Sequence, residues 1–366
     1  MDNGMVGKRI ADYRQRAGMT QQELAGEAGM ERSALAKVET GNRRVGVAEL
    51  AAVAAALGVR MEWFLQPAPD DVVAYRSALA PDAPTSSIDQ LIEHVARSVD
   101  FVSENRPQKI AALAGGERTL RSRDDAEEFA KVVRATLALK GAEPVADLGE
   151  SAAAIGALIF VQDLGTDAPE GASVVSRHCG VAVVNGALKV GRRRLAAAHE
   201  LGHLLTRDGY RVDWRIEAPD QNEAEMRLDQ FARALLLPEK AVIDAIECDR
   251  DGGMREKAIR LASEYQVDMA TVARRLHELD LVSKSDEAMV RAVRTTAADI
   301  VELNLVIRRD LEPPFAPRIY QKLVLDLYRS ESVTASRALD LLAGTFSYTD
   351  LPERPSVPEA VTWQAL

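Results

Sequence analysis

The stretch Ala198-His199-Glu200-Leu201-Gly202-His203-Leu204-Leu205 constrains this chain of 366 residues more than any other. Residues four apart lie one turn apart on the same helix face, so the imidazoles of His199 and His203 can converge on one metal ion. Residues 194–205 contain no proline and are rich in alanine and leucine, which predicts a mostly buried helix with Gly202 as its one weak helix former. Glu200 lies roughly a quarter-turn away, where it suits a water on the metal better than the metal itself. The five-residue pattern also arises by chance in core helices, so the prediction of a metal site needs a third ligand.

A second helix supplies a candidate for that ligand. Residues 221–237 repeat apolar positions with a period near 3.6 and stop at a proline. A catalytic zinc site has three protein ligands and an open position, and Glu225 on this helix is the candidate third ligand. Asp229, one turn further along the same face, can accept the second ring N–H of a ligand histidine. Glu223 is the alternative ligand, but it lies on another face and its neighbour one turn on is Arg227, which cannot accept that hydrogen.

Together these segments resemble the ImmA/IrrE family of metallopeptidases, whose pattern is H-E-L-G-H followed by E-x-x-A-x-x-F-A-x-x-L-L-x-P. The resemblance covers roughly residues 124–246. It implies that the two histidines and Glu225 bind Zn²⁺ and that Glu200 is the catalytic base. One position departs from the pattern, because Leu228 stands where the family usually has a small residue. Relatives tend to cleave a single helix-turn-helix repressor, so the resemblance also implies a protein substrate of that kind.

Length and composition are consistent with two or three domains that have proper cores, because 47% of the residues are hydrophobic. The net charge of −10 argues against a protein that coats nucleic acid, but it allows a local basic surface. Two cysteines, Cys179 and Cys248, are too few for a disulfide framework, and the N-terminus has no signal pattern. No apolar run approaches the length of a membrane span. We therefore expect a cytoplasmic protein with no membrane segment.

Residues 1–66 form a module of their own. Helical patterns at residues 6–17, 20–28, 31–39 and 47–57, with a short fifth element near 61–65, are separated mainly by glycine turns. Thr20 and Glu23 make a capping box at the start of the second helix, and a tight glycine turn leads to the third, as in a helix-turn-helix. Residues 7–44 carry eight basic and five acidic side chains in an otherwise acidic chain, which suits phosphate contact.

The motif T-Q-x-E-L-A followed by G-x-x-x-S-x-L-x-x-x-E-x-G resembles the Cro/C1-type (XRE) DNA-binding domain. The resemblance implies a double-stranded DNA operator as partner, with the third helix in the major groove. The alternative is a helical interaction module that has kept this fold but no longer binds DNA. By the resemblance, Gln21, Arg43 and Arg44 face phosphates, while Arg32, Ser33 and Lys37 face base edges.

The remaining segments predict an α+β chain that is mostly α. Residues 67–87 are rich in proline and acid and predict a semi-stiff linker. Residues 88–123 contain a connecting helix whose narrow apolar stripe can face its own core or a second copy, and XRE domains usually read paired half-sites, so we expect a homodimer. Residues 124–246 form the peptidase core, with helices at 124–140 and 147–155. Residues 247–366 read as a helical domain with a degenerate helix-turn-helix-like segment at 261–279.

Three short strands are expected in the core, at residues 157–161, 172–177 and 180–184, and the last two are expected to pair as a hairpin. In zincins an edge strand beside the active helix commonly receives the substrate peptide, and this hairpin is the candidate. Cys179 lies at its turn. Its thiolate could reach the open zinc position and hold the enzyme latent until oxidation, although a turn cysteine without a role is the simpler interpretation.

These patterns lead to one functional hypothesis and one alternative. The hypothesis is a DNA-binding transcriptional regulator with a zinc-dependent endopeptidase domain, which cleaves a repressor, or itself near residues 67–87, to switch stress or mobile-element genes. The alternative is a non-catalytic XRE-type regulator or antitoxin-like protein that uses the peptidase fold as a sensor or interaction scaffold. Glu200 favours catalysis, because a sensor would not need the base.

Overall fold

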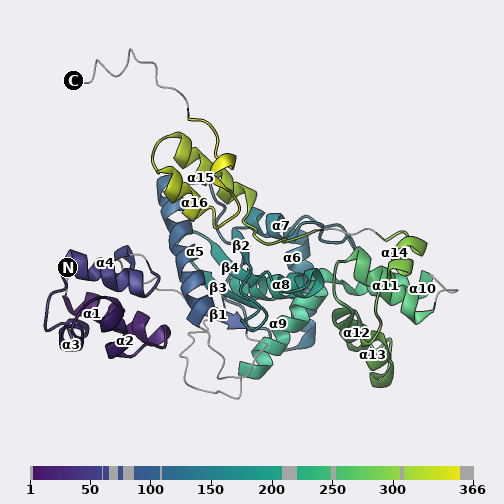
Figure 1. Ribbon diagram of the computed structural model, residues 1–366. Coiled ribbons are helices and arrows are strands. Elements are labelled where there is room, and N and C mark those ends of the chain that lie inside the picture. The colour runs from purple at the N-terminus through teal and green to yellow at the C-terminus, as the bar shows by residue number, and fades with distance from the viewer. Residues whose placement is uncertain are drawn as a thin grey trace, which may run out of the picture. The chain divides into compact units, whose positions relative to one another are not determined.

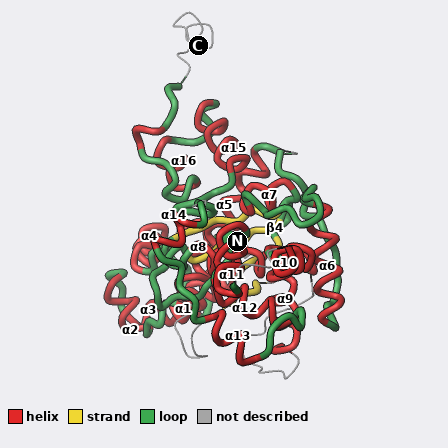
Figure 2. The backbone as a smooth tube through the Cα atoms, turned by 90° about the vertical axis from the view of Figure 1, so that its right-hand side faces the viewer, coloured by secondary structure: helices red, strands yellow, loops and turns green. Residues whose placement is uncertain are grey.

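The computed structural model describes residues 3–59, 61–65, 73–76, 86–107, 109–207, 221–248, 253–305 and 309–354. The chain folds as two compact units, Met1–Asp70 and Asp71–Leu366. Helices dominate, and the strands gather in one small sheet (Figure 2), which confirms the predicted class of α+β, mostly α. Most of the predicted linker and the end of the chain after residue 354 lie outside the described residues.

The first unit is an all-α module, as predicted. Its capping box is present: the Thr20 hydroxyl accepts from the Glu23 amide at 3.2 Å, and the Glu23 carboxylate accepts from the Thr20 amide at 2.7 Å. Ile10, Leu24 and Phe64 are fully buried in its core. The elements are α1 (Asn3–Arg16), α2 (Gln21–Glu27), α3 (Arg32–Glu39), α4 (Val47–Ala56) and a 3-10 turn η1 (Met61–Phe64).

The second unit contains a four-stranded sheet in the order β1-β3-β4-β2. The predicted hairpin is confirmed, because β3 and β4 pair antiparallel, and β2 runs parallel to β4. The outermost strand was not predicted: β1 pairs antiparallel with β3 and comes from the segment that we expected to be linker. Among the residues that the structure describes, the outer side of β2 carries one bridge, between Val161 and Phe315. The bounds are β1 (Val73–Arg76), β2 (Ala157–Gln162), β3 (Gly171–Val175) and β4 (Gly180–Asn185).

Both faces of this sheet are buried, and alternate residues of β4 divide between two cores. Ala182 and Val184 pack in the core that contains α8 and α9, whereas Val181 and Val183 pack on the opposite side with α5 and α15. Figure 1 shows α5 and α8 on opposite faces of the sheet. The helices are α5 (Ser86–Asn105), α6 (Arg123–Thr136), α7 (Leu148–Ala154), α8 (Val190–Thr206), α9 (Gln221–Leu236) and α15 (Arg318–Arg329).

The apolar stripe of α5 covers its own sheet. Ile88, Ile92, Val95, Val99 and Val102 are at most 2% exposed and share a core with β3, β4 and α15. The suggestion that this stripe faces a second copy of the chain is therefore wrong. An amphipathic helix needs some apolar surface to cover it, and here the same chain supplies that surface.

The C-terminal third is helical, as predicted. The expected helix-turn-helix-like segment forms α11 and α12, where Arg275 is buried, pairs with Glu127 and donates to the Leu237 carbonyl at 2.9 Å. This helix pair therefore packs into the core. The elements are α10 (Glu239–Cys248), α11 (Met254–Glu264), α12 (Met269–Glu278), α13 (Lys284–Arg291), α14 (Ala297–Glu302), α16 (Ala335–Leu341) and a 3-10 turn η2 (Tyr348–Asp350).

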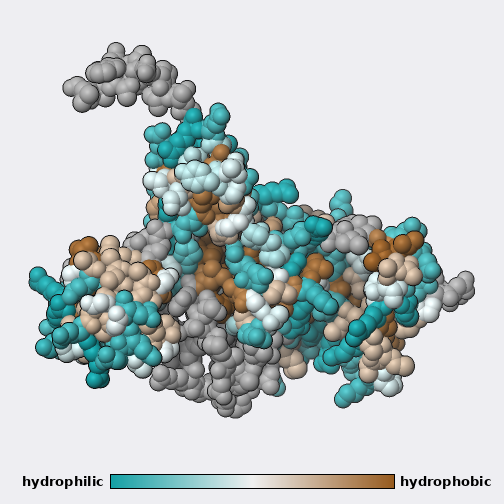
Figure 3. Space-filling model, in the orientation of Figure 1, coloured by the Kyte–Doolittle hydropathy of each residue, from teal (hydrophilic) through white to brown (hydrophobic). Residues whose placement is uncertain are grey.

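Hydrophilic residues cover much of the face seen in Figure 3. Among the described residues, no helix has the length and hydrophobicity that crossing a membrane requires.

Candidate functional site

Helices α8 and α9 bring the predicted metal-binding residues together. His199 Nε2 lies 3.1 Å from His203 Nε2 and 3.0 Å from Glu225 Oε2, and His203 Nε2 lies 3.4 Å from Glu225 Oε1. The ligand atoms of these three residues lie within 4.8 Å of one another. The histidines are buried and Glu225 is half-buried, so the cluster can be approached from the Glu225 side. Glu223, the alternative ligand, is exposed and is not part of the cluster.

Asp229 fixes the orientation of the first histidine. Its Oδ1 lies 2.9 Å from His199 Nδ1, so an Nδ1–H donated to this carboxylate leaves the Nε2 lone pair directed at the cluster. Two imidazole nitrogens and a carboxylate oxygen that converge in this way form a donor set that Zn²⁺ prefers. The residues therefore fit the metal that the sequence predicted.

Electrostatics in the cluster favours a cation. Burial acts to raise the pKa of Glu225, but its contacts with His199 and His203 outweigh burial and hold that pKa well below its usual range. Burial lowers the pKa of His199, yet hydrogen bonds with Asp229 and Glu225 raise it overall to about 9. A metal ion bound here would have to displace a proton from His199, because only the neutral imidazole is a ligand.

Glu200 lies beside the cluster and against the sheet. It is 1% exposed, and among the described residues neither of its carboxylate oxygens has a hydrogen-bond partner of normal geometry. Burial raises its pKa, while the two histidines and then Ser173 act in the opposite direction. Gly171 at the start of β3 touches the carboxylate so closely that a Cβ there would lie 2.9 Å from Glu200 Oε1. Glu200 thus stands between the candidate metal-binding cluster and strand β3.

Gly202 allows the two helices to approach each other. A Cβ at this position would lie 2.9 Å from Phe231 Cδ1 and 3.0 Å from Leu228 Cδ2. Leu228, the residue that departs from the family pattern, is buried and fills the space in front of this glycine. The contact of α8 with α9 therefore accommodates the larger side chain and still brings Glu225 to the histidines.

A buried ion pair anchors the start of α8. Arg194 is fully buried, pairs with Asp310 and donates to the Val145 carbonyl at 2.6 Å. Asp310 also accepts from the Leu148 amide at 3.1 Å. Helix α8 is thereby tied to the segment before α7 and to the chain before α15. Sequence reasoning missed this pair, because nothing near Asp310 in the sequence points to α8.

The structure does not support the expectation that Cys179 reaches the metal. Cys179 is 1% exposed and belongs to the core on the α5 side of the sheet, whereas α8 lies on the other side. Burial raises the pKa of its thiol to about 12, and its Sγ lies 4.0 Å from the Ser176 hydroxyl. A buried, protonated thiol on the far face cannot act as a metal ligand. Its alternation with Val181 and Val183 in the sequence places it on the same face of the sheet as these two residues.

The residues assigned to DNA divide into two groups in the first unit. Arg32, Ser33 and Lys37 are exposed on α3, and Arg44 is exposed after it. The other two, Gln21 and Arg43, have hydrogen-bond partners within the unit.

The Gln21 amide donates to Glu39 Oε2 at 2.7 Å, and Arg43 Nη2 donates to Glu49 Oε1 at 2.7 Å. The structure therefore leaves the three residues predicted to face bases exposed, and it holds two of the three residues predicted to face phosphates against acidic neighbours.

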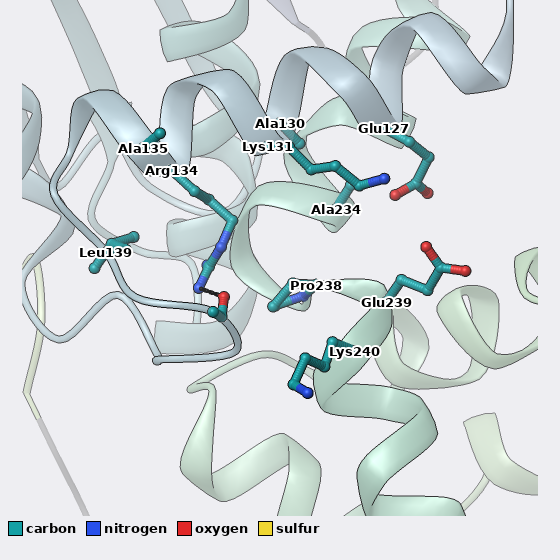
Figure 4. A pocket seen from close by; sticks show the side chains of 11 residues that line it. Glu127, Ala130, Lys131, Arg134, Ala135, Leu139, Ala234, Pro238, Glu239 and Lys240 are labelled. Carbon is teal, nitrogen blue, oxygen red and sulfur yellow. Dashed lines mark hydrogen bonds between the residues drawn. The ribbon is translucent and has the colours of Figure 1, made fainter.

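A cavity of about 370 Å³ lies between α6 and the α9–α10 turn, away from the metal-binding cluster. Figure 4 shows Lys131, Arg134, Glu239 and Lys240 around it. Arg134 is engaged in structure, because it donates to the carbonyls of Leu235 at 2.8 Å and of Gly141 at 3.1 Å. The candidate functional site is therefore the cluster of His199, His203 and Glu225 and not this cavity.

Comparisons with known proteins agree with both parts of the chain. The helix-turn-helix family matches residues 10–64, and the M78 peptidase family, described as the IrrE N-terminal-like domain, matches residues 152–277, which starts and ends later than the predicted core. The restriction-modification controller protein C.AhdI from Aeromonas hydrophila is 30% identical over 17% of this chain and 96% of its own, with a TM-score of 0.17. A search of curated proteins gives no match. The chain is a fusion of an XRE-type helix-turn-helix domain with an IrrE/ImmA-like domain of the M78 peptidase family.

Proposed function

We propose that this protein is a DNA-binding transcriptional regulator whose second unit is a zinc-dependent endopeptidase. The observation that carries the proposal is the convergence of His199, His203 and Glu225 within 4.8 Å, with Glu200 buried between this cluster and a strand of the sheet. A scaffold or sensor needs no buried carboxylate at that place, whereas hydrolysis of a peptide needs a base beside the reacting carbonyl.

Each residue of the site has a role in that reaction. His199, His203 and Glu225 would hold the metal, and Asp229 would keep the His199 ring in its orientation. Zn²⁺, when bound, supplies Lewis-acid polarisation of the scissile carbonyl and activation of a water molecule. Glu200 takes a proton from the attacking water and later delivers it to the leaving amine. The raised pKa of Glu200 suits this exchange, since a base of very low pKa would hold the proton too weakly.

The partners that we propose follow from the two domains. The first unit would bind a double-stranded DNA operator, as a homodimer on paired half-sites. The second would cleave a helix-turn-helix repressor, or its own chain, in a cytoplasmic switch of stress or mobile-element genes. Cleavage of a repressor is supported by the presence of a repressor-like domain on the same chain, which can bring the peptidase to the same promoter.

The test uses the full chain with Zn²⁺, incubated with each helix-turn-helix repressor encoded near its own gene and alone. We expect cleavage by the parent, none by Glu200→Gln, and one bound zinc in both. Glu225→Gln should lose zinc and cleavage, whereas Glu223→Gln, a matched change two residues away on the same helix, should retain both. If Glu200→Gln binds zinc and behaves as the parent does against every repressor and against itself, the peptidase proposal is wrong and the sensor or scaffold alternative stands.

A further inference from the structure

Strand β1 forms one outer edge of the sheet, next to the candidate active site. It pairs with β3 in the register Val73↔Val174, Ala74↔Ser173 and Arg76↔Gly171, and the two strands are antiparallel. No described strand pairs with its other side, because β1 ends the order β1-β3-β4-β2. The elements that it contacts most are β3 and α8, the helix that carries Glu200.

The residues of β3 that face Glu200 are the register partners of β1. Gly171 lies against the Glu200 carboxylate, and the Ser173 hydroxyl acts on it. Positions 76 and 74 of β1 stand opposite these two residues. The backbone of β1 therefore runs past the candidate catalytic base, on the sheet edge nearest to it. Within the described part of the chain, the opposite edge, at β2, carries only the bridge to Phe315.

An extended peptide is bound by a sheet edge through main-chain hydrogen bonds, which do not depend on the sequence of the peptide. Such a peptide on β3 would present its carbonyls beside Glu200, as cleavage requires. β1 already makes these hydrogen bonds, with four residues from the segment that joins the two units. We propose that β1 is an intramolecular occupant of the substrate-binding edge, so that a substrate peptide pairs with β3 only after it displaces β1.

This inference rests on the proposed peptidase function and adds its regulation and the form of its substrate, an extended segment. The occupying strand is short, and a short tethered strand competes through its high effective concentration and not through many contacts. Val73 is the third residue of the second unit, directly after the chain leaves the DNA-binding unit. The occupying strand is thus the first described element of the peptidase unit in sequence order.

The probe for the test is a fluorescently labelled peptide with the sequence of residues 71–80, DVVAYRSALA. Its binding to the full chain is measured by fluorescence anisotropy with Zn²⁺ present. All the proteins compared carry Glu200→Gln, so that the peptide is not cleaved. Ala74→Pro with Tyr75→Pro disrupts β1, because alternate residues of an antiparallel strand direct their N–H toward the partner and one of two neighbouring prolines must remove such a donor. Ala80→Pro with Ala83→Pro is the control, in the same proline-rich segment but outside β1.

We expect the β1 variant to bind the peptide about tenfold more tightly than the parent and the control, as for a tethered competitor whose effective concentration exceeds its dissociation constant about tenfold. Equal binding by all three proteins, or binding by none, overturns the inference. A second measurement needs no folding-sensitive variant: with excess peptide, hydrogen exchange in the parent should speed up in residues 73–76 while β3 stays protected. Continued protection of residues 73–76 under saturating peptide means that β1 is a permanent strand, and the inference is wrong.

The two proposals can fail separately. If the peptide displaces β1 but the parent protein, which keeps Glu200, cleaves no repressor, the inference about β1 is supported and the proposed peptidase function is wrong. If the parent and the β1 variant cleave a repressor at the same rate, the peptidase function is supported and the inference about β1 is wrong.

Discussion

The close contact of α8 with α9 makes Gly202 the most informative position to change. Gly202→Ala adds one methyl group to the face of α8 that packs on α9. Alanine in a helix interior is favoured over glycine by about 0.5–1 kcal/mol. Local propensity alone therefore predicts that the variant is more stable than the parent.

Packing predicts the opposite sign. The new Cβ would lie 2.9 Å from Phe231 Cδ1 and 3.0 Å from Leu228 Cδ2, about 0.5 Å or more inside ordinary carbon contact. The Phe231 ring cannot turn aside, because it is fully buried and its centroid lies 4.9 Å from that of Phe129. Overpacking of this kind costs about 1–3 kcal/mol, so we expect a net loss of about 1–2 kcal/mol in the unfolding free energy of the second unit.

The shift should also reach the metal. α9 carries both Phe231 and Glu225, so a shift of this helix away from Gly202 also moves Glu225, the proposed third ligand. Ligand distances tolerate only about 0.2 Å. We expect zinc affinity, measured by competition with a chelator, to fall about tenfold or more. Calorimetry should show that the melting temperature of the second unit falls by about 2–4 °C for each kcal/mol of unfolding free energy lost.

Gly26→Ala is the matched control. Gly26 is an exposed helical glycine of α2, and a Cβ there would meet nothing within 4 Å. The same substitution should therefore raise the melting temperature of the first unit and leave zinc binding unchanged. If Gly202→Ala also raises the melting temperature and keeps the zinc affinity of the parent, the argument that this glycine sets the spacing of α8 and α9 is refuted.

Three further predictions concern the two ligand sites and the buried thiol. Asp229→Asn should lower zinc affinity about 10- to 100-fold, because the His199 ring loses its carboxylate acceptor, whereas Asp244→Asn, at an exposed position of α10, should not; chelator competition measures both. Cys179, with a pKa raised to about 12, should react with iodoacetamide at pH 8 at least about a hundredfold more slowly in the folded protein than in urea, and equal rates followed by mass spectrometry would contradict its burial. Arg32→Ala should relax operator specificity, while Arg44→Ala should weaken binding to all DNA sequences and reduce the salt slope of binding by about one; titrations at several salt concentrations separate the two effects.

The parts of the structure that follow from local sequence could be predicted. Helix periodicity and the Thr20 cap locate the helices of the first unit, and the spacing of His199 and His203 places both on one face of α8. The same spacing places Glu225 and Asp229 on one face of α9, and the need of a zinc site for a third ligand pairs that face with the histidines. Within each helix the groups lie close in the sequence, whereas the pairing of α8 with α9 rests on metal-site chemistry, because His199 and Glu225 lie 26 residues apart.

Nonlocal pairing could not be predicted in the same way. The pattern of α5 shows that a stripe is apolar, but not whether the sheet of the same chain or a second chain covers it. Strand β1 lies in a proline-rich segment, and its partner Val174 is about a hundred residues further along the chain, so neither its existence nor its register has a local signal. The pairing of Arg194 with Asp310 is hidden for the same reason.

The burial of Glu200 bears on the choice between enzyme and scaffold. A buried carboxylate without a full set of hydrogen bonds costs about 1–3 kcal/mol or more, and an apolar side chain of similar size at that position would remove the cost. Burial also raises the pKa of Glu200, so the surroundings oppose its charge. A fold that only sensed or docked a partner would gain stability by losing this group, whereas a peptidase requires it at that place. The position of Glu200 therefore favours catalysis, because the residue that would act as the base is also one whose burial lowers the stability of the fold.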